Sequence, residues 1–189
     1  MPTSPNPEAV QRLLDKEEIR DAICRYARGV DRGDMAAVRT AYHPDAWDEH
    51  GADFAGRVDD FIPWVEKRLA GNDNSMHFLG QTLIEFAGPD LAVAETYFAS
   101  RRLLHPVPEA YAGIVGASDA VAREGWGRYV DRFERRDGQW RVAHRTVVME
   151  AFSHSIALGG KRPAQGGTWG RRDQTDRVYA LRAEVLQAD

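Results

Sequence analysis

Cysteine, long apolar runs and clustered positive charge are all scarce in this sequence of 189 residues. The single cysteine, Cys24, cannot form an intrachain disulfide, and its place in an apolar helical pattern predicts a small buried thiol. No segment approaches the length of a membrane span, and the first ten residues have neither the basic nor the apolar part of a secretion signal. We therefore expect a cytoplasmic protein with no membrane partner.

Charged residues are numerous but mixed in sign, with 25 Lys and Arg against 29 Asp and Glu and a formal net charge of -4. Because the basic residues do not gather in a stripe, nucleic acid is not an expected partner. The sequence also lacks a Gly-rich phosphate loop, paired-cysteine zinc spacing, an HExxH motif and a nucleophile elbow. His43, His50 and His77 with nearby aspartates match no standard metal spacing. We therefore expect neither a cofactor nor a metal.

The first third of the chain has the periodicity of amphipathic helices. Apolar residues recur at spacings of four, three and four at Ile19, Ile23, Tyr26 and Val30. They predict a first helix from about Pro7 to Arg32, which Gly33 ends, and a short second helix over residues 35–42. A third helix is expected to begin at Asp59 or Asp60 and to end at Gly71, after a turn-like stretch.

From Met76 onward the pattern changes to long runs rich in β-branched and aromatic residues. We expect strands within residues 77–86, 92–104, 127–136 and 140–152. Asp137-Gly138 favours a tight antiparallel hairpin, and Gly88-Pro89 marks a second one. Helices followed by antiparallel strands indicate an α+β fold with the helices on one face of a bent sheet.

The regular pattern predicts one domain over residues 1–153 and a C-terminal extension over residues 154–189. Three interpretations of the extension stay open: a lid on a pocket, a contact with another subunit, or a partly disordered tail. The Gly- and Pro-punctuated segment 105–120 is either a lid or a plain connector.

Few residues carry chemistry by their own pattern. Asp31, at the end of the first predicted helix, is by itself more typical of a solvated carboxylate, and a lone His77 is more often structural. In the last strand, alternation sends either His144 or Arg145 into a cavity, but hardly both. An arginine buried among apolar side chains would require an anion beside it.

Four segments together resemble the SnoaL-like branch of the nuclear transport factor 2 superfamily: "LLDKEEIRDAICRYARGVDRGDMAAVRTAYHPDAWDEHG", "FAGRVDDFIPWV", "MHFLGQTLIEF" and "YVDRFERRDGQWRVAHRTVVM". The resemblance spans about residues 8–153. It implies a cone in which a curved antiparallel sheet wraps around three N-terminal helices and encloses a deep apolar pocket.

The resemblance also implies a catalytic site. Scytalone dehydratase, bile acid 7α-dehydratase and hexachlorocyclohexane dehydrochlorinase use an Asp on the first helix and a His on a later strand, matched here by Asp31 and His77. The dehydrochlorinase has an arginine five residues after a tryptophan, which corresponds to Arg145 after Trp140. Tyr26 stands where the bile acid enzyme has a tyrosine and the dehydrochlorinase a lysine, which favours oxygenated substrates.

Further residues are candidates for binding the substrate. Glu95 and Tyr97 share one strand face and, with His144, are candidates for the pocket wall, although a solvated outer face is an equal alternative. Four aromatic residues are candidates for the cavity mouth, with plain core packing as the alternative: Tyr42, Trp47, Phe54 and Trp64.

These residues lead us to expect a cofactor-independent lyase for a bulky aromatic or alicyclic alcohol, in aromatic compound catabolism. An Asp-His pair would remove a proton in a dehydration, or in a retro-aldol C–C cleavage that releases a small aldehyde. An isomerase or polyketide-type cyclase, and a noncatalytic binding domain, stay open as alternatives. The relatives imply a homo-oligomer, a trimer first and a dimer second.

Overall fold

The structure is a computed structural model that describes residues 6–70, 72–104, 106–116, 119–160 and 168–186. The helices among these residues are α1 (Pro7–Arg32), α2 (Met35–Thr40), α3 (Val58–Leu69) and α4 (Arg177–Leu186), and a short 3-10 helix, η1, covers Glu109–Tyr111. Its strands are β1 (Tyr42–Glu49), β2 (Ala55–Arg57), β3 (Asn72–Phe86), β4 (Leu91–Leu104), β5 (Ala120–Arg136) and β6 (Gln139–Ala157). The three predicted N-terminal helices are confirmed; the third ends at Leu69, and Gly71 lies outside the described residues.

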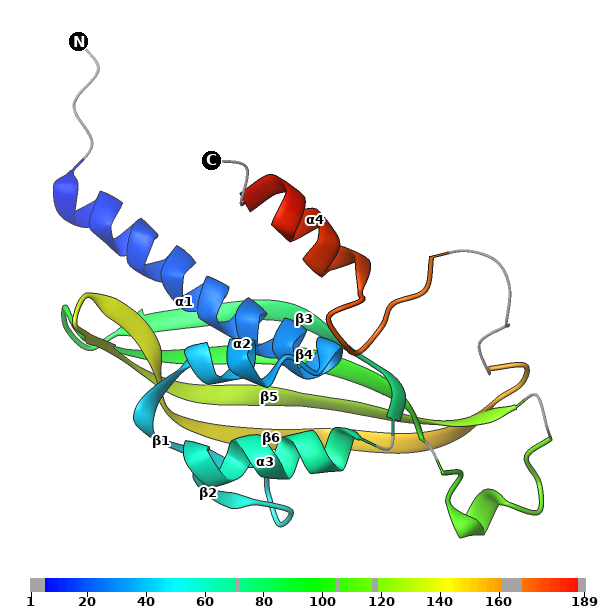
Figure 1. The fold of residues 1–189 in the computed structure, drawn as a ribbon. Coiled ribbons are helices and arrows are strands. Elements are labelled where there is room, and N and C mark those ends of the chain that lie inside the picture. The colour runs from blue at the N-terminus through cyan, green and yellow to red at the C-terminus, as the bar shows by residue number, and fades with distance from the viewer. Residues whose placement is uncertain (1–5, 71, 105, 117–118, 161–167, 187–189) are drawn as a thin grey trace.

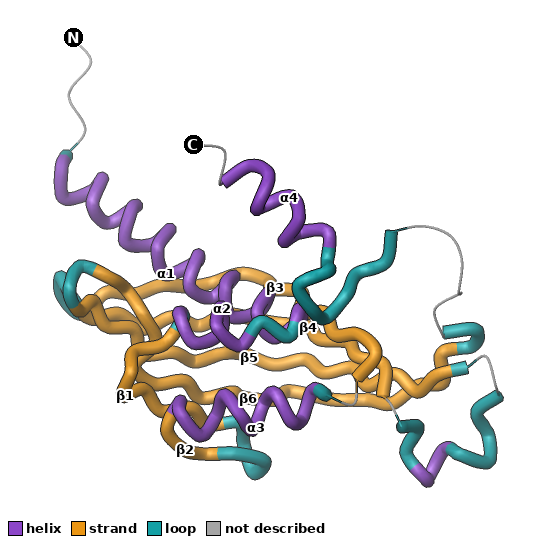
Figure 2. The backbone as a smooth tube through the Cα atoms, in the orientation of Figure 1, coloured by secondary structure: helices purple, strands orange, loops and turns teal. Residues whose placement is uncertain are grey.

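The strands form one curved sheet in the order β2-β1-β6-β5-β4-β3, and α1, α2 and α3 lie against one face of it (Figures 1 and 2). The α+β cone is confirmed, with one correction: β1 pairs parallel with β6, so the sheet is mixed rather than wholly antiparallel. Strand β1 was not predicted because polar residues interrupt its apolar alternation; pairing with β6 and β2 forms it instead.

The two predicted hairpins are present. Asp137 and Gly138 both have positive φ, 52° and 75°, as a tight two-residue turn between β5 and β6 requires. Gly88 and Pro89 lie in the turn between β3 and β4. The long antiparallel strands β3 to β6 therefore follow directly from local sequence signals.

One irregularity in β6 decides which side chains face the helices. Phe133 of β5 pairs with Val142, whereas Arg132 pairs with His144, so Ala143 is bulged out of the ladder. The bulge shifts the alternation by one residue. Trp140 and Val142 before it, and Arg145 and Val147 after it, are therefore all buried.

The core lies between α1, α3 and the concave face of the sheet. Its largest fully buried side chains include Trp140, Tyr42, Phe61 and Phe133. The indole nitrogen of Trp140 donates to the Asp15 carboxylate of α1 over 3.1 Å, which fixes the helix on the sheet. Cys24, by contrast, is exposed on α1 rather than buried, because it lies beside the apolar stripe and not within it.

The described part of the C-terminal extension, residues 168–186, packs against the end of α1. Arg172 donates to the carbonyl oxygens of Leu69 (2.7 Å) and Val30 (3.2 Å), and Tyr179 donates to Asp34 over 2.9 Å. Strand β6 itself continues to Ala157, a few residues beyond the predicted domain boundary. Whether the extension acts as a lid or a subunit contact stays a prediction.

None of the helices described is long and apolar enough to cross a bilayer. Within segment 105–120, residues 105, 117 and 118 lie outside the described residues. The ring of Tyr111 in η1 lies 5.9 Å from that of His154, and no described residue of this segment lines the main pocket.

Candidate functional site

Asp31 and His77 form a carboxylate–imidazole pair at the inner end of a pocket. Asp31 lies in the last turn of α1, which ends at Gly33 in a left-handed conformation with a φ of 68°. His77 lies on β3, and its Nδ1 is 2.7 Å from Oδ1 of Asp31. The His77 backbone N–H donates to Oδ2 over 2.7 Å, and the Ser75 hydroxyl donates to Oδ1 over 3.1 Å.

These contacts define the protonation of the pair. Burial alone would raise the pKa of Asp31, but the hydrogen bonds and charge of His77 and the Ser75 hydroxyl outweigh it and lower this pKa. An ionised carboxylate only accepts hydrogen bonds, so the proton of neutral His77 is on Nδ1. Its Nε2 therefore carries a lone pair, and His77 lines the pocket.

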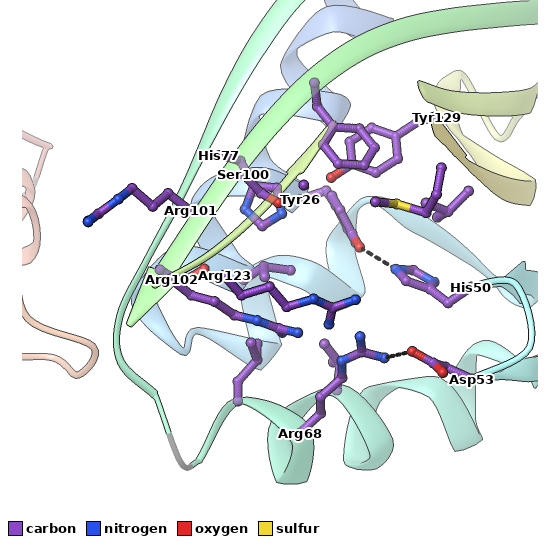
Figure 3. A pocket seen from close by; sticks show the side chains of 18 of the residues that line it. Tyr26, His50, Asp53, Arg68, His77, Ser100, Arg101, Arg102, Arg123 and Tyr129 are labelled. Atoms are coloured by element: carbon purple, nitrogen blue, oxygen red, sulfur yellow. Dashed lines mark hydrogen bonds and ion pairs between the residues drawn. The ribbon is translucent and has the colours of Figure 1, made fainter. Parts of the chain in front are cut away.

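A second carboxylate–imidazole pair, which sequence reasoning missed as a unit, lies farther along the same pocket. Asp48 of β1 is fully buried, accepts from the Tyr42 hydroxyl over 2.6 Å, and binds Nδ1 of His50 through its other oxygen. Nε2 of His50 lies 3.5 Å from the Tyr26 hydroxyl (Figure 3). Because Nδ1 is bound to a carboxylate, Nε2 is the acceptor and Tyr26 the donor.

Tyr26 is a neutral donor in this arrangement. Burial raises its pKa above the ordinary value, and the nearby Asp48 adds to the rise, while Arg145 opposes it. The Arg145 guanidinium carbon lies 4.1 Å from the centroid of the Tyr26 ring. Tyr26 therefore keeps its proton at neutral pH and presents it toward His50.

Of the two alternatives, Arg145 points inward, and the anion that the sequence argument required is Asp131 on β5. The two groups form a bidentate pair, with bonds of 2.7 Å from Nε and 2.6 Å from Nη2, and both are buried. Although burial would lower the pKa of Arg145, the charge of Asp131 raises it well above its ordinary value. Arg145 lies behind the tyrosine rings and does not contact the Asp31–His77 pair.

The pocket is a cavity of about 140 Å³ that is partly open to solvent. Apolar and aromatic side chains make most of its inner wall: Val30, Trp64, Val65, Leu69, Phe98, Val147 and Met149. Among the residues that the structure describes, no group of three or more His, Cys, Asp or Glu side chains is arranged to hold a metal ion.

The mouth of the pocket is strongly basic. Arg68 from α3, Arg102 from β4 and Arg123 from β5 extend toward one another there (Figure 3). Asp53, which binds Arg68 over 2.6 Å, is the carboxylate drawn beside them.

Of the predicted site residues, the structure brings His77, Tyr26 and Trp64 to the pocket wall, and Asp31 lies behind His77, bound to its Nδ1. Tyr42, Phe54 and Arg145 lie behind its wall, in or against the core. The remaining predictions are corrected by the geometry. Glu95 and Tyr97 are on the outer face of the sheet, where Glu95 binds Arg128, because the inward positions of β4 are Thr96 and Phe98.

His144 and Trp47 also lie away from the pocket. His144 points outward, 3.4 Å from Glu49, because the bulge at Ala143 places Arg145 on the inner face in its stead. Trp47 is 40% exposed on β1. No local sequence signal marks the pocket residues His50, Arg102 and Arg123; only the pairing of distant strands and the β1–β2 turn brings them together.

Comparison with protein families gives the same answer as the fold. Residues 11–146 match the model of the SnoaL-like domain family. The match covers well over half of the chain, so this protein belongs to the SnoaL-like domain family, within the superfamily of nuclear transport factor 2-like folds. A search of curated proteins gave no match.

Solved structures with this fold include enzymes. A putative scytalone dehydratase from Novosphingobium aromaticivorans superposes with a TM-score of 0.66 at 14% identity, covering 82% of this chain and 99% of that one. A hexachlorocyclohexane dehydrochlorinase of type 3 from Novosphingobium barchaimii gives 0.67 at 16% identity, covering 84% and 99%. A protein of unknown function from Mycobacterium tuberculosis gives 0.59 at 19% identity and covers 98% and 94%. At these identities the likeness establishes the fold alone.

Proposed function

We propose that this protein is a cofactor-independent lyase that removes water from a bulky aromatic or alicyclic alcohol, with His77 as the base. One observation carries the proposal: a carboxylate holds Nδ1 of His77, so that the unprotonated Nε2 is available in a largely apolar pocket. Asp31 fixes the tautomer and stabilises the imidazolium that forms when His77 accepts a proton. The dehydratase and dehydrochlorinase neighbours support elimination chemistry on this fold.

In the proposed step, Nε2 of His77 takes a proton from the carbon next to the one that bears the hydroxyl. The electron pair of the broken C–H bond forms the second bond of the new C=C group as the C–O bond breaks. Tyr26 donates its proton to the departing oxygen, which leaves as water, and His50 relays a replacement proton from solvent. The proton on His77 returns to solvent, so the reaction releases one water and consumes no cofactor.

Arg145 is a positioning residue in this mechanism. Its guanidinium lies over the rings of Tyr26 and Tyr129, at 4.1 and 4.2 Å from their centroids, and not beside the Asp31–His77 pair. A cation over a phenol ring stabilises negative charge that develops on its oxygen. We therefore assign to Arg145 the support of Tyr26 rather than the orientation of the catalytic pair.

A second candidate is an isomerase or cyclase. The observation that favours it is the second imidazole, His50, held by Asp48 near the Tyr26 hydroxyl. One histidine would remove a proton and the Tyr26–His50 pair would return one to another carbon, with no leaving group.

The test uses separate His77→Ala and Asp31→Asn proteins on a panel of aromatic and alicyclic alcohols. Alkene formation is followed by ultraviolet absorbance, and small-aldehyde release is assayed in parallel to detect C–C cleavage. We expect each change to lower kcat by roughly 10²–10⁴-fold, the range of general acid–base catalysis, with circular dichroism unchanged. His144→Ala, an outward histidine of β6, is the control and should keep full activity. Activity that survived both site changes would rule out this mechanism.

We also propose a homo-oligomer, with a trimer as the first choice. Exposed apolar side chains on the outer face of the sheet support it: Phe78, Leu83, Val93, Tyr97 and Trp126. Multi-angle light scattering on the full chain would give the mass of the assembly, and a monomer at micromolar concentration would contradict the proposal.

A further inference from the structure

Three guanidinium groups converge at the mouth of the pocket from three different elements. Arg68 lies in the last turn of α3, whereas Arg102 and Arg123 lie on the adjacent strands β4 and β5. Arg102 lies an even number of residues after Phe98 on β4, and Arg123 an even number before Tyr129 on β5. Side chains at even spacing share one face of a strand, so both arginines lie on the concave face with these aromatic rings. All three side chains therefore point into the same space (Figure 3).

The positive charge at the mouth is not balanced. Arg68 is bound to Asp53, 2.6 Å from one carboxylate oxygen. Within the described residues, Arg102 and Arg123 form no hydrogen bond or ion pair; the guanidinium of Arg123 lies 5.3 Å from the ring centroid of Phe152. Three cations thus face one carboxylate in a partly buried place.

The strand register makes this arrangement unfavourable in the free protein. Arg102 and Arg123 are directly opposite each other in the β4–β5 ladder, where like charges destabilise a sheet. Burial lowers the pKa of Arg102 to about 10, and the charges of Arg68 and Arg123 contribute to this effect. Both arginines remain charged at neutral pH, so an anion bound between them would relieve their repulsion.

We propose that Arg68, Arg102 and Arg123 bind an oxyanion group of the substrate, so that the pocket accepts an apolar ring compound that carries a carboxylate or phosphate. The inference deepens the proposed function and rests on it for the identity of the ligand as substrate. Guanidinium forks match the geometry of carboxylate and phosphate oxygens. With the charged end at the mouth, the apolar ring extends inward between the walls toward His77.

The binding test uses probes of one shape and different charge. Affinities of the full chain for 2-naphthoate, 2-naphthyl phosphate and the neutral 2-naphthamide are measured by isothermal titration calorimetry at low ionic strength. We expect one of the two anions to bind at least tenfold more tightly than the amide, and which one does so identifies the oxyanion. This preference should fall as salt is added.

Substitutions at Arg102 and Arg123 test whether these two residues cause the preference for the anion over the amide. In Arg102→Met/Arg123→Met we expect the anion to bind no more than about twofold better than the amide, while the affinity for the amide itself is kept. The matched control is Arg132→Gln, which removes an exposed arginine of β5 that pairs with Glu134. A preference that survives the double change, or that is absent from the unaltered protein, would overturn the inference.

Calorimetry on His77→Ala separates this inference from the proposed function. An anion preference in that protein, in the absence of any turnover by the unaltered chain, would retain the oxyanion site and reject the lyase. Turnover of neutral alcohols without any anion preference would retain the lyase and reject the oxyanion site.

Discussion

The inner end and the mouth of one pocket differ in how their charges are compensated. At the inner end Asp31 holds His77, Asp48 holds His50 and Asp131 holds Arg145. At the mouth, Arg102 and Arg123 have no carboxylate bound to them within the described part of the chain. The fold therefore fixes the inner charges without any ligand, whereas those at the mouth are left for a ligand to neutralise.

The same two strands supply both regions. Phe98 of β4 and Tyr129 of β5 stack at the inner end with ring centroids 4.4 Å apart, and the inward positions farther along these strands are Arg102 and Arg123. The inward positions of these strands thus change along the pocket from aromatic to cationic, with Ser100 and Gly125 between them. The inner end and the mouth therefore differ in the side chains that β4 and β5 carry and not in the strands that form them.

The largest effect is expected from breaking a pair at the inner end. Asp131→Asn leaves Arg145 buried without its carboxylate, and breaking a buried pair on one side costs about 3–5 kcal/mol. Urea unfolding followed by fluorescence would measure the free energy of unfolding. The control is Glu95→Gln, which breaks the solvent-screened pair with Arg128 on the outer face and should destabilise the protein far less. Equal losses in the two proteins would contradict the buried role of Asp131.

A smaller, pH-dependent effect is expected for Asp31→Asn. The folded-state pKa of Asp31 is lowered from 3.8, so its ionised form stabilises the fold above that pH, and this contribution disappears as the pH falls through the folded pKa. Hydrogen bonds to a charged group are worth about 1.5–3 kcal/mol. The unaltered protein should exceed the variant in stability by roughly this amount at pH 6, and the gap should close toward pH 2. A gap that is constant with pH would mean that the carboxylate charge is not responsible.

Sequence reasoning found the paired inner end better than the mouth. Asp31, His77, Tyr26 and Arg145 were named because they match a family pattern, and the requirement for an anion beside an inward arginine follows from the energy of burial. By contrast, the opposition of Arg102 and Arg123 depends on the β4–β5 register, which no local pattern specifies.

Long-range pairing also explains the errors. The parallel pairing of β1 with β6 brings Asp48 close to the pocket. Polar residues interrupt the apolar alternation of β1, so the sequence pattern does not predict this strand. The bulge at Ala143 reverses the alternation of inward and outward side chains within β6. A prediction that assumes regular alternation along the strand therefore fails after this residue. Helix bounds and hairpins, which depend on nearby residues such as Gly33 and Asp137, were predicted closely.

Tyr26→Phe tests the catalytic role of the inner end separately from its stability, because it removes a neutral hydrogen-bond donor and leaves the ion pairs there intact. The contact of its hydroxyl with His50 is long, 3.5 Å, so the free energy of unfolding should change by less than about 1 kcal/mol. On an alcohol that the panel shows to be turned over, kcat should fall roughly 10²- to 10³-fold, since a donor to the departing oxygen is lost. Unchanged kcat would remove Tyr26 from the mechanism.

The smallest effect, and one of opposite sign, is expected at the mouth. Arg102→Met keeps the apolar stem but removes a charge that faces Arg123 and Arg68, so the free protein should be as stable as before or gain up to about 1 kcal/mol at low salt. Any gain should shrink as salt screens the remaining repulsion. Thermal unfolding at two ionic strengths measures both. A loss approaching that of Asp131→Asn would mean that Arg102 is compensated in the free protein, and the contrast between the two ends of the pocket would fail.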